Sequence, residues 1–128
     1  MPAPIVHFEF GTKMAAKLKS FYSDLFGWRF EEHPGMNYAL ALTHEGEGYL
    51  PPAGNINGGI FPFEHGPAYL TIYADVPDIA ASLEKAVELG AQRIMDIQTI
   101  PGVGQVVMFT DPEGHAIGMI QHESPASG

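Results

Sequence analysis

The chain of 128 residues contains no cysteine, one tryptophan and only six lysine and arginine residues. Without cysteine it can form no disulfide, no thiolate nucleophile and no cysteine metal site. The six basic residues stand against fifteen aspartate and glutamate residues, which gives a formal net charge of -9. Such a charge repels phosphate backbones, so we expect no nucleic-acid partner. The same charge either attracts a cationic small molecule or serves solubility alone.

Long apolar runs are also missing. No segment approaches the roughly 20 apolar residues that a membrane helix requires, so no membrane partner is expected. The start of the chain, Met1-Pro2-Ala3-Pro4, lacks the basic and apolar regions of a signal peptide. We therefore expect a cytoplasmic protein, and its length predicts a single domain.

The first half has the pattern of a strand, a helix and three further strands. Over residues 5–10, Val6, Phe8 and Phe10 share one face of the expected strand, and Ile5, His7 and Glu9 share the other. Gly11-Thr12 opens a stretch with helical spacing of apolar residues, and Gly27 stands where a left-handed cap would end the helix. Short strands are expected at 28–31, 36–42 and 58–63, with a long surface loop over 43–57.

The second half repeats this order. Over residues 69–74, Tyr69, Thr71 and Tyr73 share one face of a strand. Pro77 and Asp78 suit the first turn of a helix, which Gly90 would end. Strands are expected at 91–97, 105–110 and 116–121, the last two joined by the turn Asp111-Pro112-Glu113-Gly114. Aligning His7 with Tyr69 brings Gly27 to within one residue of Gly90, as expected after a duplication.

Several segments together resemble the vicinal oxygen chelate superfamily, which includes glyoxalase I, fosfomycin- and bleomycin-resistance proteins and extradiol dioxygenases. The segments are Val6-His7-Phe8-Glu9-Phe10, Phe21-Tyr22-Ser23-Asp24-Leu25-Phe26-Gly27-Trp28, Gly58-Gly59-Ile60, Ile100-Pro101-Gly102-Val103-Gly104 and Asp111-Pro112-Glu113-Gly114. They span nearly the whole chain in the family's order. The chain resembles most a bacterial glyoxalase-related subgroup, which implies no particular substrate.

The resemblance implies an α+β fold, in which two βαβββ modules form an open U-shaped barrel around a central cavity. It predicts one glyoxalase-like domain over residues 1–128. The first module would cover residues 4–63, the second 67–123, and residues 124–128 would form a tail. Relatives commonly form homodimers, and we expect a homodimer here.

The resemblance also implies four inward ligands for a divalent metal that acts as a Lewis acid. Carried to this chain, these positions fall on His7, Gly59, Tyr69 and Gly118, and His7 alone keeps a typical ligand. Fewer than three protein ligands rarely hold such a metal. We therefore expect no cofactor and no standard metal-dependent glyoxalase I chemistry, with a weak divalent metal at His7 and Glu9 left open.

The strongest local signal is His7 beside Glu9 on the face expected to line the cavity. A carboxyl group among apolar residues tends towards a raised pKa, which suits a general acid or base. Alternatively, the two side chains form a structural hydrogen-bonded pair. Candidate catalytic residues are His7, Glu9, Tyr69 and Tyr73; candidate ligand-binding residues are Tyr38, Gly59, Phe61, Thr71 and Gly118. Gly59 and Gly118 are interpreted as leaving room for a ligand.

Two functions fit these residues. The chain is either a metal-independent lyase or isomerase acting on a small oxygen-bearing substrate, or a non-catalytic protein that sequesters a small molecule, as bleomycin-resistance proteins do. In the first case His7 and Glu9 transfer protons, and Tyr69 or Tyr73 donates to a developing oxyanion. Whether it is an enzyme stays open at this point.

Overall fold

The computed structural model describes residues 2–33, 37–46 and 51–123. It contains two compact units: the first is His7–Thr71, and the second is Ile72–Gly128 together with Met1–Val6. The boundaries between them fall inside two strands, β1 (Ile5–Thr12) and β5 (Tyr69–Asp75). The predicted tail at 124–128 lies outside the described residues.

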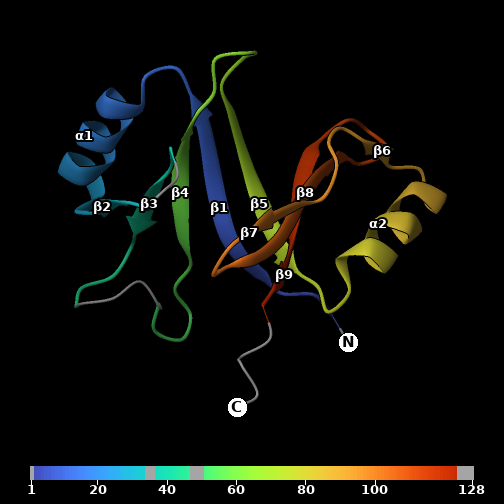
Figure 1. The fold of residues 1–128 in the computed structure, drawn as a ribbon. Coiled ribbons are helices and arrows are strands. Elements are labelled where there is room, and N and C mark those ends of the chain that lie inside the picture. Colours follow the sequence, from blue (N-terminus) through green and yellow to red (C-terminus); the bar gives the residue numbers. More distant parts are fainter. Residues whose placement is uncertain (1, 34–36, 47–50, 124–128) are drawn as a thin grey trace. The chain divides into compact units, whose positions relative to one another are not determined.

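The first unit follows the predicted order of one strand, one helix and three strands. After β1 come α1 (Ala15–Phe26), β2 (Arg29–Glu32), β3 (Ala39–Leu42) and β4 (Asn57–Pro62). Its strands lie in the order β2-β3-β4-β1, with β1 and β4 parallel and the other pairs antiparallel. Helix α1 contacts β2 and β4 (Figure 1).

Strand β1 continues further than its sequence pattern suggested. We expected Gly11 and Thr12 to open the helix, but both pair with β4, opposite Phe61 and Pro62. The Thr12 hydroxyl then accepts a hydrogen bond from the Met14 N–H, and the helix begins at Ala15. As predicted, Gly27 ends α1 in the left-handed conformation, with φ 72°.

Aromatic rings fill the space between α1 and the sheet of the first unit. Phe10 stacks on Tyr22 with ring centroids 5.1 Å apart, and Tyr22 stacks on Trp28 at 5.2 Å. Phe8 completes the group, with its centroid 5.4 Å from that of Trp28. The predicted alternation along β1 is thus confirmed, because Phe8 and Phe10 point to the α1 side of the sheet.

The second unit contains one strand more than predicted. After β5 come α2 (Ile79–Glu88), β6 (Gln92–Arg93), β7 (Gln98–Ile100), β8 (Gly104–Thr110) and β9 (Ala116–His122). The expected strand at 91–97 is wrong: β6 and β7 pair with opposite ends of β8, near Thr110 and near Gly104, so the chain must leave the sheet between them. Strands β5, β9, β8 and β6 lie side by side in that order.

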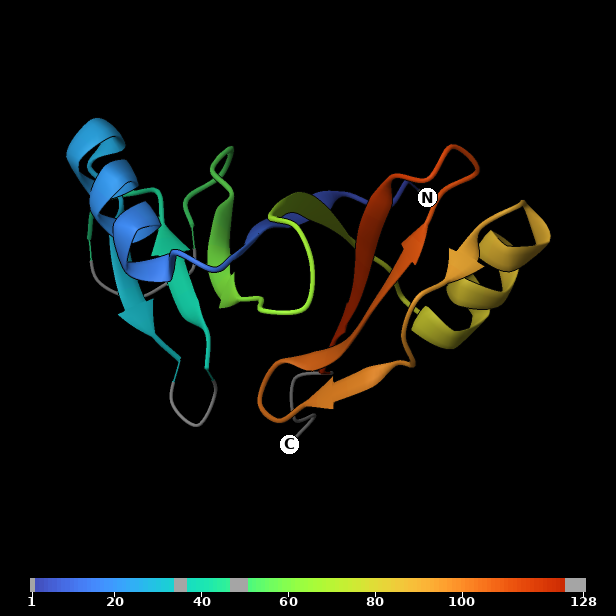
Figure 2. The ribbon, with the colours of Figure 1, turned by 90° about the horizontal axis from the view of Figure 1, so that it is seen from above.

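Helix α2 packs on β6, β8 and β9 and closes the core of the second unit (Figure 2). This core consists of Val76, Ile79, Leu83, Val107 and Met119. Asp78 caps the helix rather than forming its first turn, since its side chain accepts from the Ala81 N–H at 3.1 Å. Within the described residues, no helix is long and apolar enough to cross a membrane.

Candidate functional site

Two side chains on one face of β1 each hydrogen-bond to a tyrosine of the first unit. His7 Nε2 lies 2.7 Å from the Tyr38 hydroxyl oxygen, and the two rings stack with centroids 6.2 Å apart. Two residues further along, the Tyr69 hydroxyl donates to Glu9 Oε2 at 2.6 Å. The predicted pair of His7 and Glu9 is thus held by tyrosines that come from outside β1.

Glu9 is buried, with 7% of its surface exposed. A buried carboxylate is costly unless donors satisfy it, and a hydroxyl that donates to it stabilises the charged form. Two contacts fix the ring of Tyr69 in the place from which its hydroxyl donates to Glu9. It packs edge-on against Phe63 and lies over Gly11, where a Cβ would stand 1.8 Å from the ring. Gly11 therefore keeps open the place that Tyr69 needs to reach Glu9.

Tyr38 is positioned in the same way by Gly59. Gly59 lies in β4 directly opposite Glu9. A Cβ on residue 59 would stand 2.0 Å from the Tyr38 hydroxyl oxygen. Our interpretation that this glycine leaves room for a ligand is therefore wrong, because the phenol of Tyr38 fills the space. Phe61, two residues along β4, lies with its ring centroid 6.5 Å from that of Tyr38 and is 38% exposed.

The remaining predicted residues lie in β5 and β9. Thr71 is buried and belongs to the first unit, whereas Tyr73 and Gly118 belong to the second. Gly118 pairs with Tyr73, and a Cβ on residue 118 would stand 2.5 Å from the Tyr73 ring. Gly118, like Gly59, therefore makes room for a tyrosine of the chain itself rather than for a ligand.

The strand registers correct the alignment of the two halves. In the first unit Gly59 pairs with Glu9, two residues after His7. In the second, Gly118 pairs with Tyr73, two residues after Thr71. If the two glycines correspond, then Thr71 rather than Tyr69 is the counterpart of His7. Because a register shift of two keeps side chains on the same face, the sequence pattern alone did not distinguish these alignments.

The divalent metal that the resemblance implies does not fit these residues. Tyr38 occupies the space where a ligand side chain at position 59 would begin, and the Tyr69 hydroxyl donates to Glu9. Among the described residues, no group of three or more His, Cys, Asp or Glu side chains could hold a metal ion. His7 and Glu9 alone fall below the three ligands that such sites need.

Sequence reasoning missed that Tyr38 is the partner of His7. It treated this tyrosine as a wall of the cavity, because no spacing rule links two residues 31 positions apart. Two histidines of the second unit form other contacts: His115 bonds to Asp111 in the turn before β9, and His122 Nδ1 lies 3.3 Å from Asp75. Neither bond brings its histidine to the pair on β1.

Comparison with known proteins identifies the class. A model of the Glyoxalase/Bleomycin resistance protein/Dioxygenase superfamily matches residues 4–119. The chain therefore belongs to this superfamily. It is 32% identical over 114 residues to a lactoylglutathione lyase of Haemophilus influenzae, a match that covers 84% of each chain.

Solved structures share the fold at low sequence identity. A glyoxalase/bleomycin resistance protein/dioxygenase superfamily member from Vibrio splendidus 12B01 superposes with a TM-score of 0.60 and 15% identity, covering 95% of this chain and all of the other. Methylmalonyl-CoA epimerase from Mycobacterium tuberculosis gives a TM-score of 0.61 at 12% identity, covering 94% and 88%. The predicted α+β fold of this superfamily is confirmed.

Proposed function

We propose that the chain is a metal-independent lyase or isomerase, in which the two hydrogen-bonded pairs on β1 move a proton on a small oxygen-bearing substrate. The observation that carries this proposal is the buried Glu9 carboxylate with the Tyr69 hydroxyl 2.6 Å away. A buried, oriented carboxylate two residues from a histidine suits acid–base catalysis better than structural support alone.

In the proposed reaction, Glu9 takes a proton from the carbon beside a carbonyl group of the substrate. The electron pair of the broken C–H bond forms a C=C bond, and the carbonyl oxygen becomes negatively charged. Glu9 then returns the proton to the former carbonyl carbon, while the hydroxyl proton of the intermediate passes to the negatively charged oxygen and its own oxygen becomes the new carbonyl, which completes an isomerisation without any other reactant. Tyr69 fixes the orientation of Glu9 through its hydrogen bond and is therefore a positioning residue.

The His7–Tyr38 pair would stabilise the charge on the substrate oxygen. When the His7 proton is on Nε2, His7 donates to the Tyr38 oxygen, and the Tyr38 hydroxyl would act as a donor to the substrate oxygen. A fixed donor aimed at a developing oxyanion is among the largest contributions to catalysis. The sequence had suggested Tyr69 or Tyr73 for this role, and the Tyr69 hydroxyl donates to Glu9.

The substrate class is supported by the relative from Haemophilus influenzae, whose name states a lyase that acts on lactoylglutathione. We propose a 2-hydroxy carbonyl compound or the thiohemiacetal of a 2-oxoaldehyde as the substrate, because both carry an acidic C–H beside a carbonyl group. We also propose that the protein works in the cytoplasm as a homodimer.

The proposal is tested with the Glu9→Gln variant, which keeps the shape and an acceptor oxygen but loses the base. The assay follows conversion of the glutathione adduct of methylglyoxal, and deuterium exchange into hydroxyacetone by NMR, both with a chelator present. We expect turnover to fall at least about 100-fold, with substrate affinity changed only a few-fold. The matched control is Glu31→Gln, on an exposed position of β2.

Two results would contradict the proposal. One is turnover by Glu9→Gln equal to that of the unmodified protein. The other is an unmodified protein that binds these probes but neither converts them nor exchanges their protons. The second result, combined with loss of affinity for cationic aromatic molecules in Glu9→Gln, would support sequestration instead.

A further inference from the structure

Phe61 is an exposed aromatic residue in β4. The strand residues before it, 57–60, are all buried, whereas 38% of the Phe61 surface is exposed. Side chains alternate along a strand, so Phe61 lies on the same face of the sheet as Gly59, which pairs with Glu9. An apolar ring is therefore open on the face that carries the two hydrogen-bonded pairs, where a ligand can cover it.

Tyrosines of the chain fill the space on two sides of Phe61. Along β4, the Tyr38 hydroxyl covers Gly59, and the ring centroids of Tyr38 and Phe61 lie 6.5 Å apart at an angle of 35°. In β1, the residue opposite Phe61 is Gly11, which the Tyr69 ring covers. Neither glycine leaves its space to the Phe61 ring, so this ring stays at the surface.

The strand register places the Tyr38 hydroxyl between Glu9 and Phe61. Gly59, which this hydroxyl covers, lies directly opposite Glu9, and Phe61 is two residues further along β4. With strands about 4.8 Å apart and a rise of about 3.3 Å per residue, the Cα atoms of Glu9 and Phe61 are about 8 Å apart. A small ketone spans this distance. When its carbonyl oxygen accepts from Tyr38 and its acidic C–H faces Glu9, the other substituent of the carbonyl carbon lies over Phe61.

We propose that Phe61 selects substrates whose carbonyl carbon carries an aromatic ring. The selection rests on the proposed function, because it takes Glu9 and Tyr38 as the groups that act on the substrate. It narrows the substrate class to aryl 2-hydroxy ketones and the thiohemiacetals of aryl 2-oxoaldehydes. Paired aromatic rings gain free energy beyond the apolar area that they bury. The neighbouring tyrosines restrict the Phe61 ring before a ligand arrives, which lowers the entropic cost of stacking.

The experiment compares two neutral ketones, 2-hydroxyacetophenone and hydroxyacetone, which differ only in a phenyl or a methyl group on the carbonyl carbon. Their affinities for the full chain are measured by ligand-observed NMR, which requires no turnover. We expect the phenyl ketone to bind about tenfold more tightly than hydroxyacetone. Phe61→Ala should weaken binding of the phenyl ketone about tenfold and change that of hydroxyacetone less than about twofold. Phe61→Leu keeps an apolar side chain that protects the fold, and its affinity for the phenyl ketone should be intermediate.

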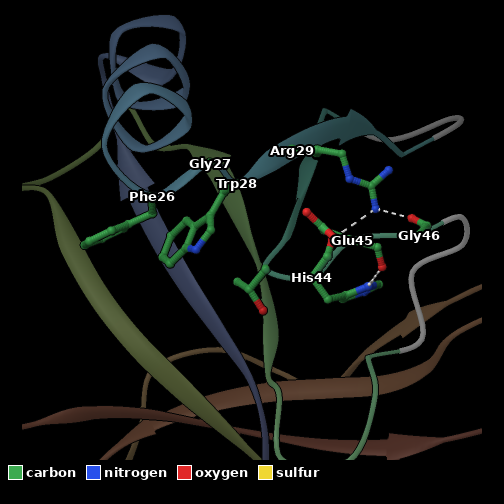
Figure 3. Close-up of a pocket in the computed structure, with 8 residues that line it drawn as sticks. Phe26, Gly27, Trp28, Arg29, His44, Glu45 and Gly46 are labelled. Carbon is green, nitrogen blue, oxygen red and sulfur yellow. Dashed lines mark hydrogen bonds between the residues drawn. The ribbon is translucent and has the colours of Figure 1, made fainter.

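Another hollow of the first unit supplies the matched control. It has a volume of about 570 Å³ and is lined by Phe26–Arg29 and Thr43–Gly46, and Phe61 is not part of it (Figure 3). An apolar ketone that entered this hollow would contact its aromatic residues, among them Trp28. We expect Trp28→Phe to bind the phenyl ketone as tightly as the unmodified chain. Weaker binding by Trp28→Phe together with unchanged binding by Phe61→Ala would assign the preference to this hollow and overturn the proposal.

Deuterium exchange at the carbon between the carbonyl and hydroxyl groups, recorded in the same samples, tests the proposed reaction separately. Binding that depends on Phe61 without any exchange would support the selection and contradict the reaction. Exchange of both ketones with affinities that do not depend on Phe61 would support the reaction and overturn the selection. The selection is also overturned if the phenyl ketone does not bind the unmodified chain, or if it binds Phe61→Ala equally tightly.

Discussion

The Tyr38 hydroxyl oxygen lies 2.0 Å from the point where a Cβ on residue 59 would stand. Gly59 and Tyr38 are thus complementary, because the Tyr38 phenol occupies the space that a side chain on residue 59 would fill. The same holds for Gly118 and Tyr73 in the second unit. At two of the four positions where the superfamily resemblance implies a metal ligand, this chain has a glycine covered by its own tyrosine.

The first prediction follows from this complementarity. Gly59→Ala should lower the free energy of unfolding by about 1 to 3 kcal/mol, since the added methyl group overlaps the Tyr38 phenol. Tyr38→Ala should cost stability by itself, but the double variant should be more stable than the sum of the two losses predicts. Urea unfolding of all four proteins measures this coupling, and strict additivity would contradict it.

The second prediction concerns the bond between Tyr69 and Glu9. Tyr69→Phe removes one donor from the buried carboxylate and should reduce the free energy of unfolding by about 1 to 3 kcal/mol. Tyr22→Phe is the control, because no hydrogen bond of its hydroxyl is found in the described part of the chain. Equal losses of stability in the two variants would show that the Tyr69 hydroxyl adds nothing.

The third prediction is a pH dependence at the turn between β8 and β9. The backbone N–H of His115 lowers the pKa of Asp111 below 3.8, with further bonds from the His115 side chain and the Glu113 N–H. Since the folded pKa lies below the unfolded one, Asp111 stabilises the fold above the unfolded pKa. This contribution is lost as the pH falls through the folded pKa.

Unfolding of Asp111→Ala measures this dependence. The stability difference from the unmodified chain should be largest near neutral pH and should shrink when the pH is lowered below about 4. Asp96→Ala serves as control, because Asp96 uses only its backbone carbonyl in the hydrogen bonds described here. A difference that stays constant from neutral to acidic pH would exclude a role for the Asp111 charge.

The fourth prediction concerns the proposed homodimer. Met14, Phe21 and Leu25 form an apolar stripe along α1, and each of them is more than half exposed. Grouped apolar residues of this kind often contact another chain. We expect Leu25→Glu to convert the dimer to monomers in light scattering, and Leu89→Glu, at an exposed leucine of the second unit, to leave it intact. A monomeric unmodified chain would contradict the homodimer itself.

Much of the site was readable from sequence because it depends on local alternation. The strand pattern placed His7 and Glu9 on one face of β1 and Phe8 on the other, and the structure confirms this. The end of β1 was misplaced, since Gly11 belongs to the strand only through its pairing with β4. Glycine weakens a strand pattern, and here its lack of a side chain admits Tyr69.

The sequence by itself determined the family, the order of strands and helices in the first unit, and the alternation of faces along β1. These features depend on periods of 2 and 3.6 residues and on glycines at helix ends, all of which are local. Only the tertiary structure decided that Tyr38 and Tyr69 bind His7 and Glu9, and that Tyr22 and Phe8 pack on Trp28. Such contacts join residues far apart in the chain, and their geometry is set by strand register and by the space that neighbouring glycines leave open.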